Sequence, residues 1–396
     1  MESQKISMFQ ILNDPLVNLM ISLSAENRKE KEEILNELNK VDVLKLFELC
    51  AEHELEGTVA SHIMEDNLIE LPKIWQEAYN KQKNRQLFLK QKAIEVCNKM
   101  HENGIDMVVL KNGGIMLDIV DDAAACPMED IDSLVRKEDF YKAHEILLSQ
   151  GFNFKFRSEF EFEHLEEAFK DGATEYYLTM PDGEKIWFEL AWRAVAGRWI
   201  RPDLEPDTDL FINNSHPAKE TFAYVLSPED NLLQVCIHTA KHSYVRAPGL
   251  RLHLDVDRII SNCEIDWDLF LEKVKQSHTK SAVYLSLLIP ANLFNTDVPE
   301  YVLEQLKPKK RKLNVLLKGL SNAGLLHPKQ RKFSKLAFLR FQTAIYDSYK
   351  DMLKVIYPNS KWMKERYGYK SSLLTPIYMA TRALDLVGIR KKKVSK

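Results

Sequence analysis

The chain has 396 residues, of which 45% are hydrophobic and 29% are charged, and its net charge is −3. This is an ordinary globular composition, and the length favours two or three packed lobes. The longest apolar stretch, residues 282–294, is shorter than the roughly 18 residues that indicate a membrane span, and the N-terminus does not resemble a signal peptide. We therefore expect a cytoplasmic protein without a membrane partner.

The cysteines argue against two further classes of protein. They are scattered, odd in number and never spaced as CxxC, which is unlike a disulfide framework or a zinc knuckle. We interpret them as reduced thiols with packing roles, at Cys50, Cys97, Cys126, Cys236 and Cys263.

The charge is distributed unevenly along the chain. Residues 301–396 carry 23 Lys and Arg against 5 Asp and Glu, so the remainder of the chain is strongly acidic. A basic region of this kind can hold a polyanion such as a triphosphate or a nucleic acid. The alternative is that its basic helices face solvent or dock on the acidic part of the chain.

Residues 1–103 form the first predicted region, which is helical. Apolar residues recur there at spacings of three and four, at 9–23, 34–49 and 74–100.

The periodicity changes after residue 103. Residues 105–110 are typical of a short strand, which ends at Lys111-Asn112-Gly113-Gly114, where the two glycines can adopt the positive φ of a tight turn before a short helix near 115–120. Backbone N–H groups of this turn could hold phosphate oxygens, with Lys111 as a counter-charge. The segment lacks the P-loop spacing, and a glycine pair after a strand is also compatible with a simple turn.

Residues 129–135 (EDIDSLV) predict a second strand, with Asp130 and Asp132 on one face and Ile131 directed into the core. Two carboxylates side by side repel one another, and aspartate is disfavoured in strands. Magnesium would compensate for this cost, because it prefers hard oxygen ligands and also binds substrate phosphates. The alternative is that the tripeptide is the exposed start of an edge strand.

A helix over 137–150, ended by Gly151, and a β-hairpin follow in the sequence. The hairpin strands, 176–180 and 186–192, flank Pro181-Asp182-Gly183-Glu184. If the second hairpin strand lies beside the strand of Asp130 and Asp132, Glu189 completes a carboxylate triad as a metal ligand or general base. Otherwise Glu189 faces solvent.

Helices resume at Ser227-Pro228-Glu229-Asp230, which has the residue types of a helix N-terminus. Further along, His238 and His242 lie one helical turn apart, but no Glu stands between them as in the HExxH zinc motif. They are interpreted either as packed histidines or, together with Lys241 and Asp255, as contacts to substrate.

The order of strand, Gly-Gly turn, helix, D-x-D strand and later carboxylate strand resembles the DNA polymerase β-type nucleotidyltransferase superfamily. The chain is most similar to its uncharacterised bacterial branch, the nucleotidyltransferase family proteins. The resemblance extends over most of the chain and is most specific at the D-I-D strand, with further similarity at Val108–Lys111, 127–135, 227–230, His238 to His242, 255–260, 266–268, 357–358 and 366–368.

This resemblance implies that Asp130, Asp132 and Glu189 bind the metal ions, and that Lys111, Gly113, Gly114 and Ser133 bind the nucleotide. The sequence departs from the family pattern in places. Asn112 stands where the branch usually has Gly, Cys126 where it often has Arg, and Glu189-Leu190-Ala191-Trp192 where a D-L-H-W-like strand is usual.

The predicted fold is α+β, with a small mixed nucleotidyltransferase sheet between N- and C-terminal helical lobes. Its regions are an N-terminal helical region, the α/β core, a helical region completing the active-site cleft and a basic C-terminal helical region, at 1–103, 104–195, 196–300 and 301–396. The predicted activity is transfer of an NMP from an NTP, with ATP favoured, to a hydroxyl or phosphate of an unidentified acceptor, favoured to be a small molecule or a peptide natural product. Mg²⁺ is the expected cofactor, with Mn²⁺ as a substitute. The alternative is a non-catalytic nucleotide-binding or regulatory module, including one that binds nucleic acid through its basic region.

Overall fold

The structure is a computed structural model that describes residues 14–156, 164–180, 182–195, 202–219, 221–242, 249–323, 325–326 and 334–386. Helices α1–α5 precede the sheet, and they occupy Pro15–Ser24, Lys31–Leu38, Val43–Glu52, Glu56–Glu65 and Lys73–Glu102. Helices interspersed with the strands are α6 to α9, at Lys111–Asp118, Phe140–Ser149, Leu165–Asp171 and Thr208–Asn213.

Helices α10–α19 follow the last strand. Their bounds are Pro228–His242, Arg251–Asn262, Trp267–Ser277, Lys280–Leu293, Glu300–Leu306, Lys310–Ala323, Lys335–Ile345, Tyr349–Ile356, Ser360–Tyr367 and Thr375–Leu386. In the described part of the chain, none of the helices combines the length and apolar character needed to cross a membrane.

One mixed sheet of seven strands occupies the middle of the molecule. The strand order is β3-β4-β5-β2-β1-β7-β6, with β2 parallel to β5, β1 parallel to β7 and the other neighbours antiparallel. The strands are Val108–Val109, Asp130–Leu134, Asn153–Phe154, Ala173–Thr179, Lys185–Ala191, His216–Pro217 and Tyr224–Val225 for β1 to β7. The α+β prediction is confirmed, and the sheet extends beyond 104–195 because β6 and β7 join its β1 side.

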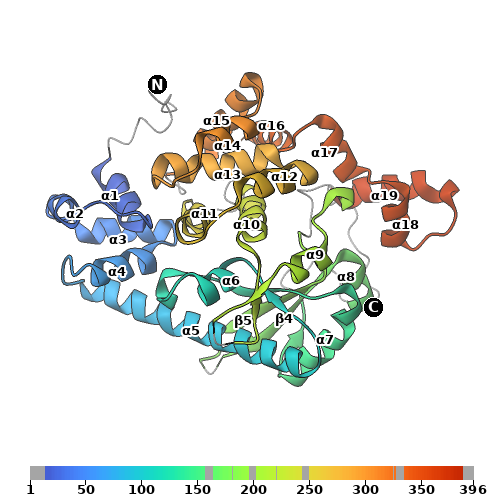
Figure 1. Cartoon of the computed structure of the whole chain (residues 1–396), viewed down its shortest axis with the longest axis horizontal. Helices are drawn as coiled ribbons and strands as arrows, with labels where there is room; N and C mark the ends of the chain where they lie inside the picture. Colours follow the sequence, from blue (N-terminus) through green and yellow to red (C-terminus); the bar gives the residue numbers. More distant parts are fainter. Residues whose placement is uncertain are drawn as a thin grey trace.

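The two faces of the sheet differ in chemistry because side chains alternate along each strand. Ile131 of β2 and Phe188 and Leu190 of β5 are completely buried in the main core. Figure 1 shows α5 and α7 along this side of the sheet, whereas α9 and the helices from α10 to α16 lie on the opposite side. We call the second face, which carries Asp130, Asp132 and Glu189, the carboxylate face.

Helix α9 packs over one end of the carboxylate face. Phe211 and Ile212 of α9 join a small core cluster with Leu134 of β2 and Ala191 of β5. Two polar ties hold this arrangement: Arg136 Nη1 lies 3.0 Å from Asp209 Oδ1 of α9, and Arg193 Nε donates to Glu205 Oε2 at 2.8 Å. The carboxylates of β2 and β5 therefore have an apolar boundary on the side of Leu134.

Helix α6 begins earlier than the sequence predicted, and the positive-φ prediction for the two glycines is wrong. The left-handed residue is Lys111, with φ 52°, whereas Gly113 and Gly114 lie inside the helix. A Cβ on Gly114 would lie 2.8 Å from the carbonyl oxygen of Val109, and one on Gly113 would lie 2.7 Å from Val109 Cγ1. The glycines are thus required for close packing of α6 on β1.

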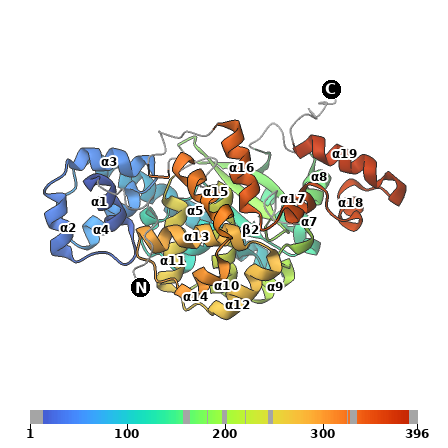
Figure 2. The same cartoon turned by 90° about the horizontal axis from the view of Figure 1, so that it is seen from above.

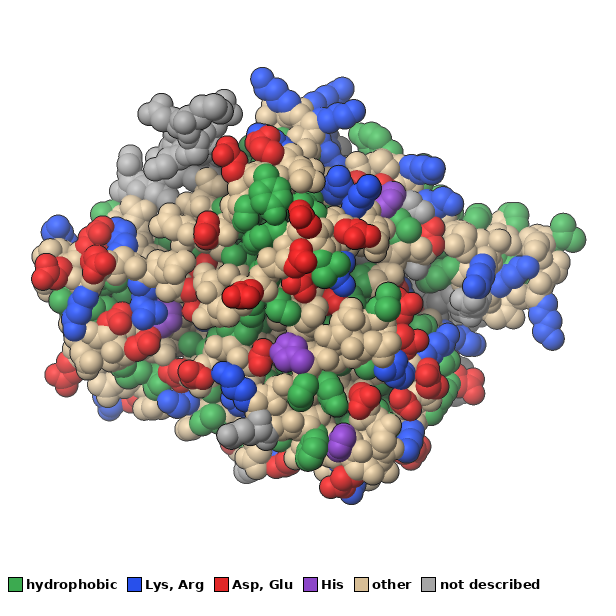
Figure 3. All heavy atoms as spheres, in the orientation of Figure 1, with side chains coloured by type: hydrophobic (Ala, Val, Ile, Leu, Met, Phe, Trp, Pro, Cys, Tyr) green, Lys and Arg blue, Asp and Glu red, His purple; other side chains and the backbone are tan. Residues whose placement is uncertain are grey.

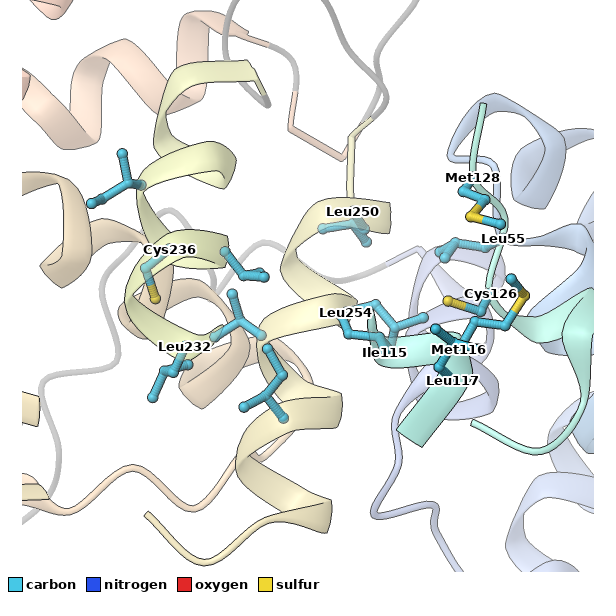
Figure 4. Close-up of a cluster of buried hydrophobic side chains, with 14 of the residues drawn as sticks. Leu55, Ile115, Met116, Leu117, Cys126, Met128, Leu232, Cys236, Leu250 and Leu254 are labelled. Atoms are coloured by element: carbon cyan, nitrogen blue, oxygen red, sulfur yellow. The ribbon is translucent and has the colours of Figure 1, made fainter. Parts of the chain in front are cut away.

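Helix α6 also lies at the meeting point of several parts of the chain. Figure 4 shows its side chains Ile115 and Leu117 between Leu254 of α11 and Cys126. All five cysteines are free, and the four apart from Cys263 are buried, which agrees with packing roles for most of them.

A buried polar network fixes the same helix. Asn112 Nδ2 donates to Asp255 Oδ2 of α11 at 2.8 Å, and Asp255 Oδ1 lies 3.4 Å from Arg258 Nη1. Arg258 is fully buried and also donates to the carbonyl oxygen of Ala125 at 2.6 Å and to Thr58 of α4 at 3.2 Å. Arg258 also pairs with Glu26 at 3.2 Å, so its network links the N-terminal helices, α11 and the start of α6.

The N- and C-terminal helices lie at opposite ends of the molecule. Viewed from above, α1–α4 are at one end and α17–α19 at the other (Figure 2). Figure 3 shows blue Lys and Arg side chains gathered along the upper edge and on the side of the C-terminal helices. The basic 301–396 region is therefore spread over several helices, and its last ten residues lie outside the described part of the chain.

The close packing of α6 predicts an unusual response to glycine substitution. Gly→Ala in a solvent-exposed helix stabilises a protein by about 1 kcal/mol, but Gly113→Ala and Gly114→Ala should each lower the free energy of unfolding by about 1–3 kcal/mol through overpacking. In urea titrations, Val109→Ala should partly relieve Gly113→Ala, since it removes the Cγ1 contact. It should not relieve Gly114→Ala, whose added Cβ meets a backbone oxygen. A stabilised Gly114→Ala variant would contradict this packing.

The buried ion pair predicts that Asp255→Ala lowers the free energy of unfolding by about 3–5 kcal/mol, because Arg258 loses a carboxylate partner in the interior. The matched control is Asp268→Ala, an exposed aspartate in the first turn of the next helix. That control should change stability by no more than about 0.5 kcal/mol. Equal effects of the two substitutions in chemical denaturation would rule out the structural role of Asp255.

Candidate functional site

Strands β2 and β5 bring the three predicted carboxylates together on one face of the sheet. The two strands are parallel neighbours, and Asp130 pairs in register with Trp187 while Asp132 pairs with Glu189. Register partners on adjacent strands place their side chains side by side on the same face. The condition that the sequence left open, that the strand of Glu189 lies next to the D-I-D strand, is met.

Lys111 supplies the positive charge at this cluster. Its Nζ lies 2.6 Å from Asp132 Oδ1, and the Asp132 side chain is 9% exposed. The local backbone explains this contact, since the N–H of Leu110 donates to the carbonyl oxygen of Asp132 at 2.9 Å and thereby extends the β1–β2 ladder to the residue before Lys111. The left-handed conformation of Lys111 then turns the chain into α6. For a non-glycine residue this conformation costs about 1–2 kcal/mol, and strained residues are frequent at functional sites.

The electrostatics follow from burial and crowding. Burial raises the pKa of Asp132, the Lys111 ammonium opposes this effect, and the other two carboxylates raise the pKa further, to about 7. For Lys111, burial lowers the pKa, but the three carboxylates outweigh it and hold the pKa above its usual value. The ammonium is therefore charged and interacts with all three carboxylates.

Within the described residues, no three or more His, Cys, Asp and Glu side chains are arranged to hold a metal ion. The three carboxylates are nevertheless a set of hard oxygen donors, the type that Mg²⁺ prefers. Their chemistry suits such an ion, while in the present arrangement the Lys111 ammonium pairs with Asp132.

Hairpin partners of Glu189 extend the carboxylate face beyond what the sequence predicted. Glu175 of β4 lies opposite Glu189, and Tyr177 lies opposite Trp187. The two aromatic rings are 5.7 Å apart between centroids, and Lys185 Nζ is 4.2 Å from the centre of the Tyr177 ring. The sequence held a signal for these residues, because a hairpin centred on Asp182 places residues at equal distances from it opposite one another.

The other predicted nucleotide contacts lie differently. Ser133 is 1% exposed and its hydroxyl donates to the backbone carbonyl oxygen of Glu189 at 2.9 Å, on the face opposite Asp132. Ser133 therefore links β2 to β5 by a hydrogen bond, and its position does not support a contact with the nucleotide. Gly113 and Gly114 are buried in the first turn of α6, next to Lys111.

The residues predicted to contact substrate lie in different environments. His238 and His242 are both partly buried on α10, with ring centroids 4.5 Å apart, and their role stays a prediction. Lys241 lies between them, but its side chain is outside the described part of the structure. Asp255 is 2% exposed and bonded to Asn112 and Arg258, a placement that supports a structural role instead of contact with substrate.

Comparison with known protein families identifies a match. The chain matches the family described as uncharacterised nucleotidyltransferase over residues 39–295, more than half of its length. No curated protein matches the chain. The matched segment contains β1 to β7 with all three carboxylates and Lys111, so the protein belongs to this uncharacterised nucleotidyltransferase family.

Proposed function

We propose that the protein is a Mg²⁺-dependent enzyme that transfers an NMP from an NTP, with ATP favoured, to a hydroxyl or phosphate group of an acceptor and releases pyrophosphate. A small molecule or a peptide natural product is the favoured acceptor. The observation that carries the proposal is the grouping of Asp130, Asp132 and Glu189 on one sheet face in a member of a nucleotidyltransferase family.

Asp130, Asp132 and Glu189 would hold the metal, since they supply the oxygen donors on this face. When bound, Mg²⁺, or Mn²⁺ in its place, would neutralise charge that develops on the phosphate oxygens during transfer. The geometry of Lys111 and α6 suits the anionic part of the nucleotide. The N-terminus of a helix carries partial positive charge, and Lys111 adds a full one beside it.

The in-line geometry of the transfer indicates which side of the carboxylate face the acceptor would occupy and which side the pyrophosphate. The acceptor oxygen attacks the α-phosphorus as the bond from this phosphorus to the pyrophosphate oxygen breaks, so acceptor and leaving group lie on opposite sides. With the pyrophosphate near Lys111 at the β1 side, the acceptor approaches over β5 and β4. If Glu189 acts as general base instead of metal ligand, it would accept the proton of an acceptor hydroxyl there; its strand neighbours Glu175, Tyr177 and Trp187 lie on the same sheet face.

The proposal predicts that isosteric loss of any of the three carboxylates abolishes transfer. Asp130→Asn, Asp132→Asn and Glu189→Gln should each lower the rate of pyrophosphate release by at least about 100-fold, because each weakens binding of the metal ion that would neutralise charge at the reacting phosphate. Because one NMP is transferred for each pyrophosphate released, the rate would be measured as transfer of label from each α-labelled NTP to the acceptor in an extract that contains it, and the labelled product identified by mass spectrometry.

Glu184→Gln is the matched control, since Glu184 lies in the same hairpin but is exposed at the turn and paired with Arg85. This variant should retain full activity. Transfer that persists in Asp130→Asn would refute the assignment of the site. Nucleotide binding without any release of pyrophosphate would instead identify the non-catalytic binding module.

A further inference from the structure

The Lys111 ammonium contacts Asp132, one of the three carboxylates that would hold a divalent ion. Its contact with Asp132 is 2.6 Å, and Asp130 and Glu189 also act on it through their charges. In the described part of the chain, carboxylates are not arranged as a ready metal site. Lys111 and a divalent ion at this face would therefore compete for the carboxylate of Asp132.

The backbone around Lys111 is anchored on both sides. Leu110 is bonded to Asp132 in the sheet, and Asn112 is bonded to the buried Asp255. Gly114 packs against the Val109 carbonyl oxygen, so α6 has little room to shift. The side chain of Lys111 is the part that can move, because lysine carries its charge on a flexible four-carbon stem.

We propose that Lys111 is an internal counter-ion that exchanges partners. It neutralises Asp132 in the nucleotide-free protein and transfers to the triphosphate when the nucleotide arrives, which exposes Asp132 to the divalent ion. This inference rests on the proposed function for the identity of the second partner. Metal binding is thereby coupled to nucleotide binding, and the protein alone has a low affinity for divalent ions.

The test is titration of the purified full-length protein with Mn²⁺ alone, in which free Mn²⁺ is measured by electron paramagnetic resonance. Lys111→Met removes the ammonium but keeps the side-chain length, and it should bind Mn²⁺ at least about tenfold more tightly than the unchanged protein. Adding Asp132→Asn to this variant should abolish the gain, because the ion then loses its carboxylate.

The matched control is Lys185→Met, which removes the same charge from a lysine on the same sheet face that lies over Tyr177. Its Mn²⁺ affinity should change by less than about twofold. If Lys111→Met fails to fold, Lys111→Asn serves instead, since asparagine tolerates a left-handed backbone.

Mn²⁺ binding by Lys111→Met that is no tighter than that of the unchanged protein would overturn the inference, as would an equal gain in Lys185→Met. The titration contains neither nucleotide nor acceptor. Its outcome is therefore separate from that of the transfer assay, and an inactive protein could still show the predicted gain in Mn²⁺ affinity.

Discussion

The parallel pairing of β2 with β5 is the constraint on which the rest of the site depends. This pairing sets Asp132 beside Glu189 and places Asp130 two residues away on the same face. Neighbouring carboxylates repel one another, and burial of Asp132 increases the cost. The fold offsets this cost with one nearby cation, the ammonium of Lys111. A cluster of three carboxylates and a lysine is costly for folding, which favours a functional role for this face of the sheet over a purely structural one.

Much of the surrounding structure positions the Lys111 ammonium beside Asp132. The β1–β2 ladder brings Leu110 to Asp132, the left-handed backbone of Lys111 turns the chain, and the glycines let α6 lie directly on β1. The buried pair of Asp255 and Arg258 then holds the helix through Asn112. Residues that are distant in sequence thus act on the position of one side chain, which explains why Asp255 belongs to the family resemblance without facing a ligand.

The elements with local signals could be predicted from the sequence. The D-I-D strand, the helix that Gly151 ends and the hairpin around Asp182 each follow from periodicity or turn residues, and all three are present. The parallel register of β2 and β5 could not be predicted, because 56 residues lie between Asp132 and Glu189 in the sequence.

Other features depend on contacts that no local pattern encodes. The positive φ lies at Lys111 instead of the glycines because α6 must approach β1 closely. The direction of Ser133 is the exception, because strand alternation places it on the face of Ile131, away from the carboxylates. The role of Asp255 depends on a buried arginine that belongs to the same helix but contacts α4 and the segment before β2.

The most direct measurement is a crystal structure of the protein with Mn²⁺ and a non-hydrolysable NTP analogue, with the ion located by anomalous scattering. The anomalous peak should lie against Asp130 and Asp132, with the triphosphate at the start of α6 and Lys111 turned towards it. An analogue bound elsewhere, with the Lys111–Asp132 contact intact and no ion on the carboxylate face, would contradict a nucleotidyl-transfer site at this sheet.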